Sequence, residues 1–427
     1  MKKLSLFLLF VFAVLDAQFS VNVVGPKDFS AKEAYLYTLN GSKDILLLKS
    51  IRKGDSWEFR VPNSYLGMLK IYFPEANTSA NFITENTNVE FVFSVKNKKI
   101  QQIDYKDDLN KVFYNLQDIQ KKKEQILPAL YQIQSFYKDN SPFGIALHNE
   151  IELLNSDLKD SIAKYNFINY YQSTYNKFLL EEAVKTTPTN DEIINFLNTS
   201  NQFLETSSLL KPILMVFLTN TNKANLGEEV DKLLQKVDIE TPRGQTILSE
   251  LIEIFNVYNI KDLKEKYLNE AKGLKCTIND RLSSTIKSNL NTTIGSILPN
   301  NKFLNATNTK VKSWHDVKAD KKIIIIWSST CPHCEKEISE IFTNYNKIKS
   351  KNIEVIGFSL DTDATAYNEK VKLLPWINDT ELKGWYSSYV ELYNVQATPT
   401  FYIVDANNKI IANPDNFSEI LEFLGLK

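Results

Sequence analysis

The region between residues 18 and 100 alternates short apolar runs with turn-forming residues. Four of these runs are rich in β-branched and aromatic side chains and have the length of strands: 34–37, 45–48, 57–61 and 89–93. Glycines and prolines stand between the runs, as is typical of the connections between strands. This pattern predicts a small β-sandwich-like domain over residues 18–100.

Between residues 101 and 290 the apolar positions recur at spacings of three and four. One such stripe consists of Leu109, Val112, Phe113, Leu116 and Ile119. Residues at this spacing share one face of a helix, so we predict an all-α helical domain over 101–290 whose stripes form its core. A peptide-binding groove along the helices is an alternative interpretation. The polar residues 277–291 fit either the end of a helix or a linker.

The last region, residues 291–427, alternates strand-like and helix-like segments. Residues 323–327 read Ile-Ile-Ile-Ile-Trp, a run too short for an ordinary helix and apolar on both faces, which predicts a central strand covered on both sides. Residues 331–349 show apolar positions at helical spacing, with Pro332 in the first turn, where its missing N–H costs little. Further strands are predicted at 353–360, 400–404 and 409–412, and helices at 364–373 and 417–424. The predicted order is β-α-β-α-β-β-α, an α/β domain.

Length and composition fit a soluble protein of several domains. The chain has 427 residues, of which 43% are hydrophobic and 24% charged. Its net charge is −1 and its isoelectric point is about 6.4. A chain with this charge has no general attraction for a polyanion, so we expect no nucleic-acid partner.

The amino terminus has the pattern of an export signal. Lys2 and Lys3 precede an apolar stretch at residues 4–15, and Ala17 offers a small residue for cleavage. The stretch is shorter than the roughly 20 residues that span a bilayer, which favours a cleaved signal over a permanent anchor. We therefore expect residues 1–17 to be a signal peptide and the mature protein to work in the periplasm or cell envelope.

The chain has three cysteines, Cys276, Cys331 and Cys334. An exported chain of this length that used disulfides for stability would carry more of them. No second paired spacing supplies a zinc site, Glu335 stands where covalent haem attachment needs histidine, and an iron–sulfur cluster needs a fourth cysteine. A peroxidase with one attacking cysteine fits less well, because a second cysteine lies two residues away. We expect no metal, and a redox-active Cys331–Cys334 pair in place of any other cofactor.

Several short motifs surround the sequence Cys331-Pro332-His333-Cys334. They are Gly295-Ser296, Pro299-Asn300, Trp327, Glu337, Tyr393-Asn394-Val395 and Ala397-Thr398-Pro399-Thr400-Phe401. Together with the order of elements, they make residues 294–427 resemble the thioredoxin superfamily, and more narrowly the TlpA/ResA-type thiol-disulfide oxidoreductases of the bacterial envelope. Thr330 and Ser339 depart from that pattern, which often has an aromatic residue and a proline there. The β-rich and helical regions resemble multidomain members of the group in pattern only.

The positions of the two cysteines assign their roles. Cys331 is expected in the exposed first helical turn, where backbone N–H groups and the imidazole of His333 lower its pKa from about 8.5 and make it the nucleophile. Cys334, one turn inward, is expected to resolve the mixed disulfide. Glu337 lies on the same helical face as Cys334 and is the expected proton acceptor, although an ordinary solvated glutamate is the alternative.

The resemblance also implies a substrate-binding surface beside the dithiol. It implies that the Thr398–Pro399 peptide bond is cis and faces the two cysteines, whereas a trans proline in a turn is the alternative. Thr398 would then offer main-chain hydrogen bonds to an extended substrate segment. Trp327 is expected in the wall beside the active site, with simple core packing as the alternative.

We therefore expect a thiol-disulfide oxidoreductase that acts on protein disulfides. The Pro-His dipeptide resembles that of oxidising DsbA-type enzymes, but the sizeable helical insertion of that fold is missing, because a strand is predicted promptly at Ile353. Most TlpA-like proteins reduce, so a reductase is favoured over a DsbA-like oxidase or isomerase. The resemblance suggests a membrane-embedded dithiol donor as a partner. An alternative hypothesis from another functional class is that the β-rich and helical domains form a binding or assembly module. The dithiol would then only regulate this module.

Cys276 is predicted to be an unpaired buried thiol near a domain junction. A disulfide-linked dimer through Cys276 is the alternative, and the sequence leaves the oligomeric state open.

Overall fold

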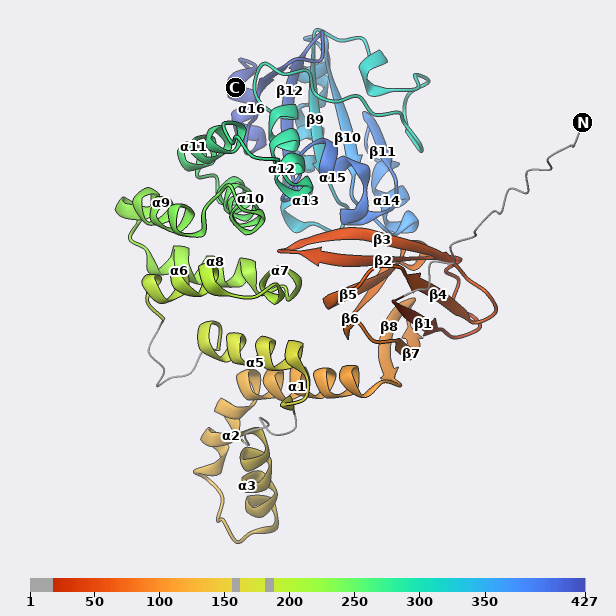
Figure 1. Ribbon diagram of the computed structural model, residues 1–427. Coiled ribbons are helices and arrows are strands. Elements are labelled where there is room, and N and C mark those ends of the chain that lie inside the picture. Colours follow the sequence, from red (N-terminus) through yellow and green to blue (C-terminus); the bar gives the residue numbers. More distant parts are fainter. Residues whose placement is uncertain (1–17, 156–161, 181–187, 427) are drawn as a thin grey trace, which may run out of the picture. The chain divides into compact units, whose positions relative to one another are not determined.

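The computed structural model divides the chain into two compact units, one up to Phe217 and one from Leu218 (Figure 1). It describes residues 18–155, 162–180 and 188–426. Helices occupy most of the predicted helical region 101–290, as expected, and the boundary between the two units falls within it. Its first helices belong with the β-rich domain, and its last helices belong with the C-terminal domain. The predicted signal peptide 1–17 lies outside the described residues.

The first unit begins with two four-stranded sheets. Their strands are β1 (Phe19–Val24), β2 (Glu33–Asn40), β3 (Lys43–Ile51), β4 (Ser56–Val61), β5 (Leu66–Phe73), β6 (Thr78–Glu85), β7 (Val89–Lys96) and β8 (Lys99–Tyr105). The strand orders are β4-β1-β7-β8 and β3-β2-β5-β6, and only the β1–β7 pair among these neighbours is parallel. The β-sandwich-like prediction is confirmed, although the last strand extends past residue 100.

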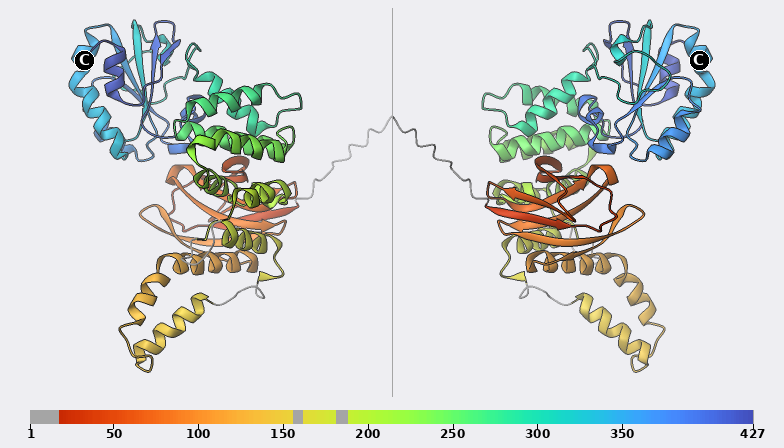
Figure 2. Two further views of the ribbon diagram at one scale, coloured as in Figure 1. Left: turned by 90° about the vertical axis from the view of Figure 1, so that its left-hand side faces the viewer. Right: turned by 90° about the vertical axis from the view of Figure 1, so that its right-hand side faces the viewer.

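Aromatic side chains from both sheets fill the core of the sandwich, which is drawn in red and orange in Figures 1 and 2. Trp57, Phe29, Phe73 and Phe93 form a cluster in which ring centroids lie 4.8 to 6.2 Å apart. All four side chains are buried, and most of the pairs meet edge to face, an arrangement that the ring quadrupole favours. The alternating apolar runs of the sequence therefore become the inner faces of the two sheets.

Helices follow the sandwich in the first unit. They are α1 (Asp108–Gln125), α2 (Leu127–Gln134), α3 (Pro142–Asn155), α5 (Asn166–Phe178), α6 (Asn190–Thr199), α7 (Phe203–Thr206) and α8 (Leu210–Asn220), which extends past the boundary. The predicted stripe on α1 is confirmed as core at Leu109, Phe113 and Leu116. The buried amide of Asn110 pairs with the backbone of Ile83 at 2.8 and 2.9 Å. This pairing satisfies backbone groups of β6, an edge strand that would otherwise be unpaired there.

The second unit begins with four helices: α9 (Leu226–Val237), α10 (Pro242–Val257), α11 (Lys261–Lys272) and α12 (Asp280–Asn291). The polar residues 277–291 are thus mostly helix and do not form a linker. Arg281 of α12 is buried, and its guanidinium pairs with Glu250 at 3.1 Å and with Glu253, both on α10. A buried charge is tolerated only with such partners, so this cluster ties α12 to α10.

The C-terminal domain is built on a five-stranded sheet. Its elements are β9 (Lys321–Trp327), α13 (Pro332–Lys349), β10 (Ile353–Ser359), α14 (Ala364–Val371), β11 (Ile377–Thr380), α15 (Ser388–Leu392), β12 (Thr400–Asp405), β13 (Ile410–Ala412) and α16 (Phe417–Phe423). The strand order is β11-β10-β9-β12-β13, with β9 parallel to β10 and antiparallel to β12. The sequence pattern missed β11 and α15. Strand β11 reads Ile-Asn-Asp-Thr, and its buried polar residues gave no apolar signal.

Strand β9 lies in the middle of the sheet and is covered on both sides, as predicted. Ile323, Ile325 and Trp327 pack with α13, α14 and α16, whereas Ile324 and Ile326 pack against the opposite layer, which includes α15. None of the four isoleucines has exposed surface, and burying one contributes about 1.5–3 kcal/mol. The strand is therefore firmly held, and the residues that follow it emerge at one edge of the sheet.

Candidate active site

The two motif cysteines lie where β9 gives way to α13. A short loop at residues 328–330 follows Trp327, and Cys331 is the N-cap residue of α13. The sulfur of Cys331 accepts a hydrogen bond from the backbone N–H of Cys334 at 3.3 Å, in place of the oxygen that usually caps a helix. Both residues are free thiols. Cys331 is partly exposed and Cys334 has no exposed surface, so a substrate can contact only the outer sulfur.

The surroundings separate the pKa values of the two thiols. Burial alone would raise the pKa of Cys331, but hydrogen bonds from the Cys334 thiol, the Thr398 side chain and backbone N–H groups hold it below the ordinary value. Burial raises the pKa of Cys334 to about 12, and its hydrogen bond to Cys331 adds to this rise. Deprotonation therefore begins at the exposed sulfur, and the inner sulfur stays protonated.

His333 influences Cys331 through its main chain. Its side chain is exposed, and the hydrogen bond that lowers the pKa of Cys331 comes from the backbone N–H of His333. The start of the helix therefore contributes to the lowered pKa of Cys331, and a contribution from the imidazole stays a prediction. Backbone N–H groups at an amino end stabilise negative charge whatever side chain they carry.

The loop before β12 faces the dithiol. The Thr398–Pro399 peptide bond is cis, as the family resemblance implied. The thiol of Cys331 donates a hydrogen bond to the backbone carbonyl of Thr398 at 3.4 Å. Thr398 and Pro399 are half-buried, so part of their surface is open next to the outer sulfur. The fold thus brings together two motifs that are 67 residues apart in the chain.

Asp361 holds the loop that carries the dithiol, and the sequence reasoning missed it. Its buried carboxylate accepts hydrogen bonds from the hydroxyl of Ser328 at 3.0 Å, from the N–H and hydroxyl of Ser329 at 3.0 and 2.6 Å, and from the hydroxyl of Ser359 at 2.6 Å. A signal was present, because a carboxylate directly after a buried parallel strand lies at the same sheet edge as the end of β9. The loop before Cys331 is therefore fixed from the neighbouring strand.

Comparison with known proteins agrees with this arrangement. Residues 294–413 match the AhpC/TSA family. Over 97 residues the chain is 27% identical to thiol-disulfide oxidoreductase ResA from Bacillus cereus (strain ZK / E33L), a match that covers 22% of this chain and 55% of that protein. The C-terminal domain is thus TlpA/ResA-like, similar to thiol-disulfide oxidoreductases of the thioredoxin superfamily. The chain spans about half the length of the curated relative that it matches.

Solved structures similar to this chain include two from Bacteroides. The thioredoxin domain of a thiol-disulfide oxidoreductase from Bacteroides vulgatus is 21% identical, covers 31% of this chain and 96% of its own, and gives a TM-score of 0.29. A thioredoxin-like protein from Bacteroides caccae is 16% identical, covers 65% of this chain and 93% of its own, and gives a TM-score of 0.32.

Glu337 of the TlpA/ResA-like domain is buried, which excludes the interpretation as a solvated surface residue. It lies one turn after Cys334 on α13. One carboxylate oxygen, Oε2, accepts the backbone N–H of Phe417 at 2.6 Å, at the first turn of α16. A carboxylate there satisfies one of the unpaired N–H groups of the helix and interacts favourably with its dipole. Glu337 therefore connects the cysteine helix to the closing helix.

Trp327 belongs to the core, and the prediction that it lines the substrate surface is wrong. Its side chain has no exposed surface, and its ring lies 6.4 Å from that of Tyr367 on α14. Its ring packs on the face of the sheet that α13 covers. Because the Trp327 side chain has no exposed surface, it packs in the core next to the loop at residues 328–330 and cannot contact a substrate in this conformation.

Cys276 lies outside the dithiol site, in the connection between α11 and α12. It is half-buried, where full burial was predicted, and it is a free thiol. Its sulfur accepts a hydrogen bond from the amide of Gln245 at 3.1 Å, and its backbone N–H bonds to Glu240 at 3.0 Å. A side-chain hydrogen bond to the carboxylate of Glu240 raises the pKa of Cys276. Cys276 is therefore less readily ionised than Cys331.

Among residues 18–155, 162–180 and 188–426, no three side chains of histidine, cysteine, aspartate or glutamate form a group that could hold a metal ion. No helix in the same ranges has the length and hydrophobicity needed to cross a membrane.

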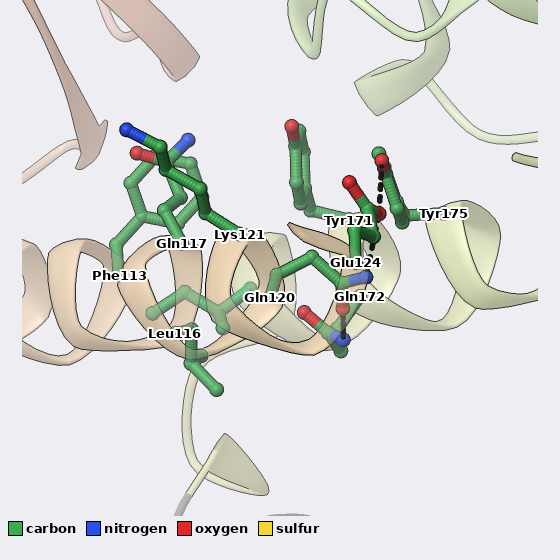
Figure 3. Close-up of a pocket in the computed structure, with 10 residues that line it drawn as sticks. Phe113, Leu116, Gln117, Gln120, Lys121, Glu124, Tyr171, Gln172 and Tyr175 are labelled. Carbon is green, nitrogen blue, oxygen red and sulfur yellow. Dashed lines mark hydrogen bonds between the residues drawn. The ribbon is translucent and has the colours of Figure 1, made fainter. Parts of the chain in front are cut away.

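A pocket of about 210 Å³ lies in the first unit between α1 and α5 (Figure 3). Most of its polar side chains bond to one another. Gln172 donates to Gln120 at 3.3 Å, and Tyr175 donates to Glu124 at 2.6 Å. Because these groups already have partners, nothing in the pocket marks it as a binding site, and the dithiol remains the candidate centre.

Proposed function

We propose that this protein is a thiol-disulfide oxidoreductase that exchanges its Cys331–Cys334 dithiol with disulfides of other proteins. One observation carries the proposal: the partly exposed sulfur of Cys331 caps α13 and contacts the carbonyl of Thr398 in the cis-proline loop at 3.4 Å. A substrate segment that bonds to the main chain of Thr398 would hold its disulfide beside the attacking sulfur.

The chemistry follows from the two pKa values. The thiolate of Cys331 attacks one sulfur of the substrate disulfide, forms a mixed disulfide and releases the other sulfur as a thiolate. Cys334 then loses its proton and attacks the sulfur of Cys331. This second step releases the remaining substrate sulfur, so the substrate gains two electrons and the enzyme holds a Cys331–Cys334 disulfide. The reverse sequence oxidises a substrate dithiol.

Glu337 is proposed to accept the proton of Cys334 in the second step. The inner thiol has a pKa of about 12 and needs a base when it attacks. Glu337→Gln tests this role, because an amide oxygen still accepts the N–H of Phe417 but is not a base. We expect mixed disulfide to accumulate in this variant while the first step keeps its rate. Unchanged resolution kinetics would assign Glu337 to the support of α16 alone.

We further propose that the protein works as a reductase in the periplasm or cell envelope, after export by the predicted signal peptide. Two features support reduction of substrates. The domain is TlpA/ResA-like, and α13 leads directly into β10 without the helical insertion of the oxidising DsbA fold. A membrane-embedded dithiol donor would then return electrons to the Cys331–Cys334 disulfide. The lowered pKa of Cys331 acts in the opposite direction, because a stabilised thiolate favours the reduced enzyme and the oxidation of substrates.

Insulin reduction by the purified chain tests the activity. We expect turnover with dithiothreitol, no turnover in Cys331→Ser, and a trapped mixed disulfide in Cys334→Ser. Cys276→Ser is the matched control and should keep full activity, because Cys276 lies outside the site. Equal activity of Cys331→Ser and the unmodified chain would refute the enzyme and favour the alternative in which the front domains carry the function.

The reduction potential of the dithiol decides the direction. A value near or below about −270 mV, as in thioredoxin, supports the proposed reductase. A value near about −120 mV, as in DsbA, would contradict it and make the protein an oxidase. Equilibration with glutathione or dithiothreitol buffers, followed by alkylation and mass measurement, gives this value.

A further inference from the structure

A cavity of about 600 Å³ lies in the second unit and extends to the cis-proline loop. Pro399 and Thr400 form part of its wall, directly after Thr398, whose carbonyl contacts the sulfur of Cys331. Helices α10, α11 and α12 supply the opposite wall, and Figure 1 shows them in green beside the C-terminal domain. Its volume falls within the roughly 300–1,000 Å³ of ligand pockets. The cavity therefore adjoins the proposed reaction centre.

Side-chain hydrogen bonds fix the helical wall to the TlpA/ResA-like domain. The amide of Asn413 donates to the backbone carbonyl of Thr292 at 3.0 Å. The amide of Asn259 donates to the carboxylate of Asp415 at 2.9 Å. All four residues line the cavity, so its two walls are connected by direct contacts.

Lys264 of α11 is the half-buried cation of this cavity. Its ammonium donates to the neutral amide oxygen of Asn256 at 2.9 Å. Burial lowers the pKa of Lys264, and the nearby carboxylate of Glu265 offsets only part of this change. The charged residues that line the cavity are three lysines and two carboxylates: Lys261, Lys264, Lys272, Glu265 and Asp415. A desolvated ammonium whose hydrogen-bond partner is neutral gains most from an incoming carboxylate.

We propose that this cavity binds the polypeptide segment next to the substrate disulfide and that Lys264 pairs with a carboxylate of that segment. The inference rests on the proposed function and specifies its substrates as disulfides flanked by acidic residues. Pro399, which is half-buried, and Ile294, whose side chain is exposed, give the cavity an apolar side for the rest of the segment. The helices that precede the redox domain thereby select its substrates.

Direct binding tests this assignment without any redox turnover. The probes are two fluorescent peptides with a central serine in place of cysteine, flanked on both sides by glutamate in one and by glutamine in the other. We expect the full chain to bind the glutamate peptide about tenfold more tightly, and Lys264→Met to lose this preference. Lys264→Arg keeps the charge and should keep the preference. Lys287→Met removes the same charge from α12 outside the cavity and should leave binding unchanged.

Equal affinity of the unmodified chain for both peptides would overturn the proposal. A loss in Lys287→Met as large as in Lys264→Met would also overturn it, because general charge attraction would then explain the preference. Reduction of a small aromatic disulfide by the same variants separates this question from the activity. If Lys264→Met reduces that reagent at the normal rate yet does not prefer glutamate, the cavity assignment is supported. If even the unmodified chain does not reduce the small aromatic disulfide, the proposed function fails. The peptide-binding result then still shows whether the cavity binds acidic segments.

Discussion

Replacement of Asp361 by asparagine is expected to loosen the loop that carries the dithiol. The carboxylate accepts four hydrogen-bond donors, three of them from Ser328 and Ser329 and one from Ser359. The asparagine side chain has only one acceptor oxygen, and its NH2 group would face donors of the serines. About half of the four hydrogen bonds therefore cannot form. A hydrogen bond to a charged group contributes about 1.5–3 kcal/mol, so the loss of two such bonds amounts to about 3–6 kcal/mol.

Urea unfolding measures this loss, and the rate of iodoacetamide reaction at Cys331 reports on the loop. We expect Asp361→Asn to unfold at lower urea and to react more slowly, because the capping sulfur is no longer held at the start of α13. Asp363→Asn is the matched control. Asp363 is exposed and caps α14, a role that asparagine fills equally well, so its stability should change by less than about 0.5 kcal/mol. A loss in Asp361→Asn no larger than in this control would refute the reasoning.

Three further changes test other parts of the structure. Cys334→Ala removes the thiol that donates to Cys331, so the pKa of Cys331 should rise and the midpoint of its pH-dependent alkylation should move to higher pH; an unmoved midpoint would contradict this. Gly357→Ala places a Cβ atom 2.4 Å from a side-chain oxygen of β11 and should destabilise the fold by about 1–3 kcal/mol in thermal unfolding, whereas Gly273→Ala, with 3.4 Å to its nearest neighbour, should be tolerated. Arg281→Met leaves two carboxylates of α10 without their cation and should cost about 3–5 kcal/mol in urea unfolding; a loss below about 1 kcal/mol would show that the cluster contributes little.

Local patterns in the sequence were sufficient for most elements of the C-terminal domain. The run at 323–327 is apolar on both faces, and only a central strand buries both faces of so short a segment. Pattern reasoning failed at β11, where Asn378 and Asp379 are fully buried in a strand. Asp379 accepts hydrogen bonds from the distant backbone of Leu304 and Asn305, so tertiary contacts stabilise a strand that no propensity predicts.

In the candidate site, too, local patterns predicted some residues, whereas tertiary contacts decided the others. The spacing of Cys331 and Cys334 was enough to predict an outer and an inner sulfur, because one helical turn separates them. The expected role of Trp327 was corrected, since a side chain's exposure depends on what packs around it. Asp361 could not be assigned from spacing, because it acts on a loop more than 30 residues away in the chain.

By itself, the sequence determined that this protein carries a vicinal dithiol at the start of a helix in a TlpA/ResA-like domain, because strand, turn and helix signals are local. The tertiary structure decided how the two thiols differ in acidity, which loop faces them and which helices form the cavity beside them. Burial and hydrogen bonding between segments far apart in the chain set these properties, and no local pattern records which segments will meet.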